Sequence, residues 1–112
     1  MKHLYIFPVY WTDKLKIDVL QRIVLIHSYL YYEKDNPVWT DKKYDETCRQ
    51  LVSLQNNHRQ QDIKTKTQYG YAFYDFDGST GFHLWSRLSR KDKRMISAIS
   101  ERIIKGEQKN EN

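Results

Sequence analysis

Two amphipathic helices separated by a proline-containing loop constrain the fold of this chain more than any other feature. Apolar residues recur at helical spacing over residues 13–34, which predicts a helix with Thr12 as its N-cap. The run Asp35-Asn-Pro37 ends that helix, because proline cannot continue one. Thr40 is a good N-cap for a second helix that begins at Asp41. The short connection predicts an antiparallel helical hairpin.

The segment after the hairpin predicts two short strands. Residues 69–76 are rich in the aromatic residues that strands favour, and residues 77–81 form a polar, glycine-containing turn. Residues 82–85 are the returning strand of the expected β-hairpin. Because a two-stranded hairpin is marginal alone, we expect the helices to cover it.

A third helix is predicted near the C-terminus, over residues 90–105. Ser89 followed by Asp92 resembles a capping box, and Gly106 is a natural helix stop. Residues 107–112 form a polar tail that we expect to be disordered. The expected fold is therefore α+β and mainly α, with one small domain over residues 1–106.

Composition narrows the class of protein. The chain has 112 residues, a formal net charge of +5, and a single cysteine, Cys48. A lone cysteine cannot form an internal disulfide, so we expect a reducing, cytoplasmic environment. Residues 1–11 do not resemble a signal peptide, and no stretch reaches the ~18 apolar residues of a membrane span.

The loop between the first two helices carries residues that fit recognition of a cationic aromatic ring. Tyr44 and Asp45 lie one helical turn after Asp41, and Tyr31 stands near the end of the preceding helix. An aromatic face beside two carboxylates suits such a ring. Taken one at a time, the tyrosines fit a helix core equally well, and an aspartate in the first turn is ordinary helix-dipole chemistry.

The run Tyr29-Leu-Tyr-Tyr-Glu-Lys-Asp-Asn-Pro-Val-Trp-Thr-Asp-Lys-Lys-Tyr-Asp45 resembles the N-terminal subdomain of NAD-dependent DNA ligases without a gap. In that family the corresponding helix pair recognises the nicotinamide mononucleotide half of NAD. The resemblance implies a nucleotide-binding site at the following residues: Tyr31, Tyr32, Asp41, Tyr44 and Asp45. Tyr32 stands where the family has a histidine that approaches the nucleotide phosphate. A phenol carries no positive charge, which weakens the expected affinity for phosphate.

The ligase nucleophile, a Lys-x-Asp-Gly motif, does not occur in the sequence. We therefore expect a binding protein and not an enzyme, with no required cofactor and with NAD or nicotinamide mononucleotide as a possible ligand. The resemblance implies a small stand-alone ligase-related protein of a phage or mobile element, acting in the cytoplasm of a bacterial host. Such a protein would bind a nucleotide or modulate a host or phage protein.

Two further surfaces are candidates for partners. The polar turn and its aromatic flanks predict a protein-binding surface made of Asp75, Asp77, Phe82 and Trp85. The basic start of the third helix predicts nucleic-acid binding through Arg87, Arg90, Lys91, Lys93 and Arg94. A solvated helix start explains the basic residues equally well, since Asp92 interrupts them.

No metal site is expected. The four histidines are His3, His27, His58 and His83, and no pair of them has metal-ligand spacing with a cysteine or carboxylate partner. His27 falls within the first helix, where a partly buried structural histidine is expected.

Overall fold

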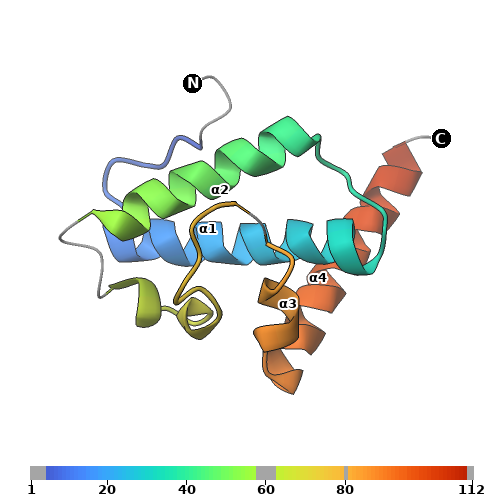
Figure 1. The fold of residues 1–112 in the computed structure, drawn as a ribbon. Helices are drawn as coiled ribbons and strands as arrows, with labels where there is room; N and C mark the ends of the chain where they lie inside the picture. Colours follow the sequence, from blue (N-terminus) through green and yellow to red (C-terminus); the bar gives the residue numbers. More distant parts are fainter. Residues whose placement is uncertain (1–4, 58–62, 80, 111–112) are drawn as a thin grey trace.

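The computed structural model describes residues 5–57, 63–79 and 81–110, and helices are the regular secondary structure in these ranges (Figure 1). Helix α1 spans Asp13–Ser28, and α2 spans Asp41–Asn56. The Thr12 side chain accepts a hydrogen bond from the Leu15 backbone N–H, and Thr40 caps α2 in the same way. Figure 1 shows the two helices running antiparallel. The predicted helical hairpin and both of its N-caps are confirmed.

Helix α1 is continued by a π-helical turn, η1, over Tyr29–Glu33. The wider turn is closed by a hydrogen bond of 3.0 Å from the Lys34 backbone N–H to the Tyr29 carbonyl oxygen. Asp35 then adopts a positive φ of 50°. Together with Pro37 this ends the helix where the sequence predicts its end.

The β-hairpin expected over residues 69–85 is wrong. The 3₁₀ turn η3 covers Gly70–Ala72, and the short helix α3 covers Leu84–Arg87. The reason is the spacing of the buried side chains, which are Tyr69, Ala72, Phe73 and Phe76. This i, i+3, i+4, i+7 spacing is helical, not the alternation of a half-buried strand. Each of these side chains enters the core of a helical protein and none needs a partner strand.

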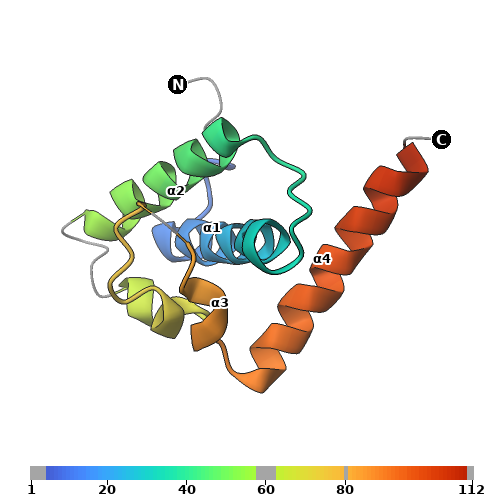
Figure 2. The same ribbon diagram turned by 45° about the vertical axis from the view of Figure 1, so that its right-hand side comes forward.

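Helix α4 spans Arg90–Asn110, and Figure 2 shows it at one side of the hairpin. The Asp92 backbone N–H donates to the Ser89 hydroxyl at 3.2 Å, so the predicted cap is confirmed. The helix continues past Gly106, where the sequence predicts a stop. A methyl group at Gly106 would meet nothing within 4 Å, so no packing opposes the helix there. The disorder expected for residues 107–112, and the domain end at residue 106, stay predictions.

Helix α1 lies at the centre of the molecule, and α2, α3, α4 and the 3₁₀ turn η2 (Ile63–Thr65) all contact it. Its fully buried apolar residues are Ile17, Leu20, Val24 and Leu25. Burying a side chain of this size stabilises the fold by roughly 1.5–3 kcal/mol.

A buried glutamine joins three segments across this core. The Gln21 amide nitrogen donates to the Gln55 side-chain oxygen at 2.9 Å and to the Lys64 carbonyl oxygen at 3.0 Å. The Thr67 hydroxyl donates to the Gln21 side-chain oxygen. Because buried polar groups are costly when unpaired, this network fixes the segment after α2 against α1.

Candidate functional site

The end of α1 and the start of α2 meet at the predicted nucleotide site. The π turn η1 carries Tyr31 and Tyr32, and their rings lie edge to face with centroids 4.8 Å apart. Both side chains are half-buried, whereas Asp41 and Asp45 of α2 are exposed. π turns occur disproportionately at functional sites, because they redirect side chains from a regular helix.

Electrostatics place Tyr31 beside the two carboxylates. The charge of Asp41 is the largest cause that raises the pKa of the Tyr31 hydroxyl, and a hydrogen bond to Asp41 and the charge of Asp45 add to it. The structure therefore brings Tyr31, Asp41 and Asp45 together, as the sequence predicts. Their combination of one aromatic ring and two carboxylates forms an electronegative surface, which favours a cationic ligand.

Tyr44 has a different position from the other four residues. Its side chain is buried, and its hydroxyl shares a hydrogen bond of 2.6 Å with the Ser28 hydroxyl. Burial is the main cause that raises the pKa of this phenol, so it stays protonated at neutral pH. The Tyr44 ring is nearly parallel to that of Tyr31, with centroids 6.3 Å apart. Tyr44 thus supports the site from the core side.

Trp39 and His27 also belong to this site, and the sequence did not predict either of them as part of it. Their rings stack with centroids 3.5 Å apart, and the Lys43 ammonium lies 4.8 Å from the centre of the Trp39 ring. Together with Tyr31, Pro37, Val38 and Tyr44 they line a cavity of only about 10 Å³. The signal available in the sequence was Trp39 itself, a large aromatic residue in a loop of seven residues between two helices.

His27 is held neutral in this stack. Its side chain is only 9% exposed, and its Nδ1 atom is buried without a hydrogen-bond partner among the described residues. Burial, and secondly the charge of Lys43, lower the pKa of His27 to about 4. The expectation of a partly buried histidine is confirmed, but its hydrogen bonds are not fully satisfied.

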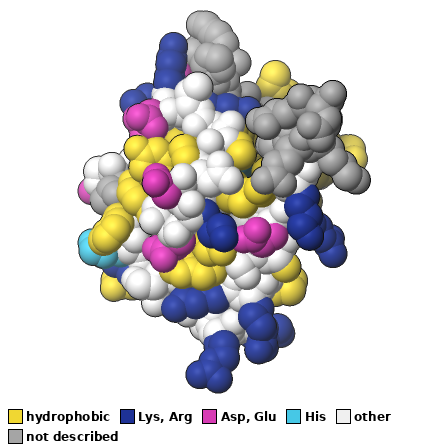
Figure 3. Space-filling model, turned by 90° about the vertical axis from the view of Figure 1, so that its right-hand side faces the viewer, with side chains coloured by type: hydrophobic (Ala, Val, Ile, Leu, Met, Phe, Trp, Pro, Cys, Tyr) yellow, Lys and Arg dark blue, Asp and Glu magenta, His cyan; other side chains and the backbone are white. Residues whose placement is uncertain are grey.

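The five basic residues predicted to bind nucleic acid do not act as one group. Arg87 pairs with Asp75, and the Lys93 ammonium lies 5.8 Å from the centre of the Trp85 ring. The other three are exposed on the first turns of α4: Arg90, Lys91 and Arg94. Figure 3 shows Lys and Arg side chains gathered at the lower end of this face, with acidic and apolar side chains above them. Nucleic-acid binding by these residues stays a prediction.

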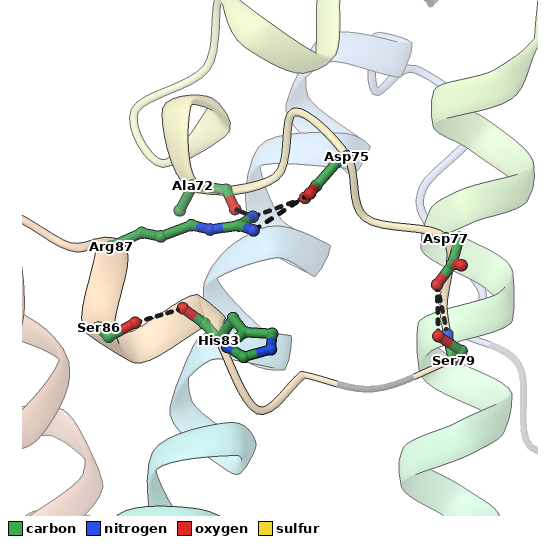
Figure 4. Close-up of polar contacts among 7 residues, drawn as sticks. All are labelled: Ala72, Asp75, Asp77, Ser79, His83, Ser86 and Arg87. Atoms are coloured by element: carbon green, nitrogen blue, oxygen red, sulfur yellow. Dashed lines mark hydrogen bonds and ion pairs between the residues drawn. The ribbon is translucent and has the colours of Figure 1, made fainter.

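The predicted protein-binding residues are also partly engaged within the chain (Figure 4). Asp75 accepts two hydrogen bonds from the Arg87 guanidinium, at 2.6 and 3.2 Å. Asp77 accepts from the backbone N–H and the hydroxyl of Ser79, at 2.9 and 2.6 Å. These bonds are the main causes that lower the pKa of each carboxyl group. Both aspartates therefore shape their loop.

The two aromatic residues of that predicted surface have different environments. Phe82 is 56% exposed, and its ring meets that of Tyr32 edge to face, with centroids 5.4 Å apart. Trp85 is half-buried, and its ring lies 4.4 Å from that of Tyr29. Phe82 therefore extends the aromatic surface of Tyr31 and Tyr32 from the neighbouring loop.

In the ranges that the structure describes, no three His, Cys, Asp or Glu side chains come close enough to hold a metal ion. His3 and His58 lie outside those ranges. Cys48 is buried, and burial raises the pKa of its thiol to about 12, which leaves it unreactive. A search of the described helices for a membrane-spanning segment finds none.

Comparison with known proteins identifies this half of the chain. Residues 12–64 match the family described as the DNA ligase-like, N-terminal NAD+-binding domain. The DNA ligase of Clostridium kluyveri is 36% identical over 52 residues, which are 46% of this chain and 8% of that ligase. The DNA ligase of Ureaplasma parvum is 43% identical over 47 residues, covering 42% of this chain and 7% of the ligase.

The DNA ligase of Ehrlichia chaffeensis is 46% identical over 43 residues, or 38% of this chain and 6% of the ligase. The chain thus spans less than a tenth of the length of these relatives. No solved structure matches it. The resemblance seen in the run Tyr29–Asp45 is confirmed: residues 12–64 are similar to the N-terminal NAD+-binding domain of DNA ligases.

Proposed function

We propose that this protein is a non-catalytic module that binds a nicotinamide nucleotide at the junction of α1 and α2. The observation that carries the proposal is the Tyr31 hydroxyl beside Asp41, within a segment that matches a ligase-like NAD+-binding domain. The cationic nicotinamide ring would lie against the Tyr31 ring, and the carboxylates of Asp41 and Asp45 would accept hydrogen bonds from its carboxamide or from sugar hydroxyls.

The site is closed without a ligand. A cavity of about 10 Å³ is far below the roughly 300 Å³ of an ordinary small-molecule pocket. Trp39 fills the space over His27, so the ring of the ligand needs Trp39 to move away. Binding then loses the stacking of Trp39, and with Tyr32 in place of a charged histidine the affinity is weak. We expect a dissociation constant on the order of 0.1–1 mM, or about 4–5.5 kcal/mol.

Titration of the ¹⁵N-labelled protein with nicotinamide mononucleotide, NAD and ADP-ribose tests this proposal. Mononucleotide and NAD, but not ADP-ribose, are expected to shift the amide resonances of Tyr31, Asp41 and Asp45. Tyr31→Ala and Asp45→Ala should each weaken binding about tenfold, the effect of losing one charged or stacking contact of about 1.4 kcal/mol.

Tyr10→Ala is a matched control, since Tyr10 is 81% exposed and lies outside the site. Binding that is equal for the control and Tyr31→Ala would contradict the proposed location. The absence of any shift at millimolar mononucleotide would contradict the function itself.

A second candidate is binding of a partner protein through the aromatic surface of Tyr31, Tyr32 and Phe82. It is favoured by the exposure of Phe82, because single exposed aromatic residues next to others are typical interface anchors. A pull-down from bacterial host lysate with the native chain and with Phe82→Ala tests it. A partner retained by the native chain and lost from the variant supports this candidate, and equal recovery by both contradicts it.

A further inference from the structure

A second groove lies at the opposite end of the hairpin, and the nucleotide site described above does not use it. Its volume is about 510 Å³, within the range of pockets that hold small ligands. It shares none of its lining residues with the cavity under Trp39. The lining residues are Tyr5, Phe7, Lys16, Arg49, Gln50, Ser53 and Leu54.

The aromatic wall of the groove is built by the segment before α1, which lies outside the ligase-like residues 12–64. The Gln50 side-chain amide forms two hydrogen bonds with the Tyr5 backbone, each of 2.9 Å. This pairing holds the segment alongside α2. Side chains alternate along an extended chain, so Tyr5 and Phe7 face the groove while Ile6 is 95% exposed.

The two rings stack with centroids 6.2 Å apart and an angle of 20° between their planes. Phe7 in turn stacks on Trp11 at 5.4 Å. These contacts order the rings before any ligand arrives, which lowers the entropic cost of stacking a further ring on them.

The charge of the groove is positive. Lys16 and Arg49 line it, and its described lining includes no aspartate or glutamate. Lys16 forms only a long ion pair of 3.7 Å with Asp13. Among the described residues Arg49 forms no ion pair, so its guanidinium is available to a ligand. Ser53 adds an exposed hydroxyl on the same face of α2.

We propose that this groove is a second ligand site, for a nucleotide whose base stacks against Tyr5 and Phe7 and whose phosphate pairs with Lys16 and Arg49. Parallel aromatic rings beside cations recognise this combination of a flat base and an anion. A free mononucleotide and a nucleotide within a single strand share this chemistry. The inference does not depend on nicotinamide binding at Tyr31.

NMR titration with three probes tests the groove: AMP, inorganic phosphate and a short oligodeoxyadenylate. AMP is expected to shift the amide resonances of Arg49 and Ser53, and phosphate alone to bind at least about fivefold more weakly, because it lacks the stacking base. An oligonucleotide that binds more tightly than AMP, with an affinity that falls steeply with salt, identifies a single strand as the source. Equal affinities identify the free nucleotide.

Matched variants show whether the groove itself binds. Arg49→Gln should weaken AMP binding about fivefold to tenfold, through loss of one charge-assisted contact. Arg102→Gln removes the same charge from an exposed position on α4 and should leave binding unchanged. Phe7→Leu should weaken AMP binding but not phosphate binding.

Three results would overturn the proposal. They are no shift at about 10 mM AMP, equal weakening by Arg49→Gln and Arg102→Gln, and equal affinity for AMP and phosphate. Tyr31→Ala separates the two sites, since it should abolish nicotinamide mononucleotide binding and leave AMP in the groove. Failure of one site is therefore distinguishable from failure of the other.

Discussion

The buried His27 should make the folded protein sensitive to mild acid. Its pKa is lowered to about 4 in the folded protein, from an ordinary value of 6.5. Above pH 6.5 the ring is neutral in both folded and unfolded chains, so it contributes no pH dependence. As the pH falls below 6.5, the unfolded chain binds a proton that the folded protein refuses until about pH 4. Acid therefore favours unfolding across this window.

The size of the effect follows from the two pKa values. At about pH 5 the difference costs the folded state about 2 kcal/mol, which is a large part of the stability of a small domain. His27→Phe should remove this loss, because phenylalanine keeps a ring against Trp39 and has no proton to bind. It also removes the buried Nδ1 atom that lacks a partner.

Urea denaturation near neutral pH and at about pH 5 measures this loss in both proteins. We expect the native chain to lose about 2 kcal/mol more than His27→Phe between the two conditions. Other groups that titrate are common to both proteins and cancel in this difference. His83→Phe is the control, since His83 is exposed and should leave the loss unchanged. Equal pH dependence in the native chain and His27→Phe would refute the reasoning.

Three further predictions concern stability. Gly81→Ala should cost about 1–3 kcal/mol in urea denaturation, because a methyl group there would collide with the buried Tyr44 hydroxyl. Thr40→Ala should cost about 1 kcal/mol in the same assay through loss of the α2 cap, and Thr40→Ser should restore it. Gln50→Leu should release the segment that it holds, so that hydrogen exchange at the Tyr5 amide, now protected by a bond of 2.9 Å, becomes rapid with little change in global stability.

The helices could be predicted from the sequence because their ends have local causes. Thr12 and Thr40 cap through their own side chains, and Pro37 ends a helix whatever surrounds it. The β-hairpin was wrong because aromatic composition outweighed spacing. Residues 69–76 are rich in residues that favour strands, yet their buried positions follow a helical period.

The candidate site shows the same division between local and tertiary causes. Tyr31, Asp41 and Asp45 could be placed together from their sequence spacing and the hairpin alone. The stack of Trp39 on His27 could not, because it depends on how the loop folds back over α1. The engagement of Arg87 with Asp75 was equally out of reach, since these residues approach one another only when α3 replaces the expected strand.

The π turn at Tyr29–Glu33 makes this molecule unusually dependent on the length of its first helix. Each residue of an α-helix advances the side chains by about 100°. A deletion within the turn would keep the buried stripe of α1 in register but rotate everything after it by about that angle. Tyr31 would then leave the carboxylates of α2, although no residue of the site had been changed. The junction is thus encoded by residue count as much as by residue type.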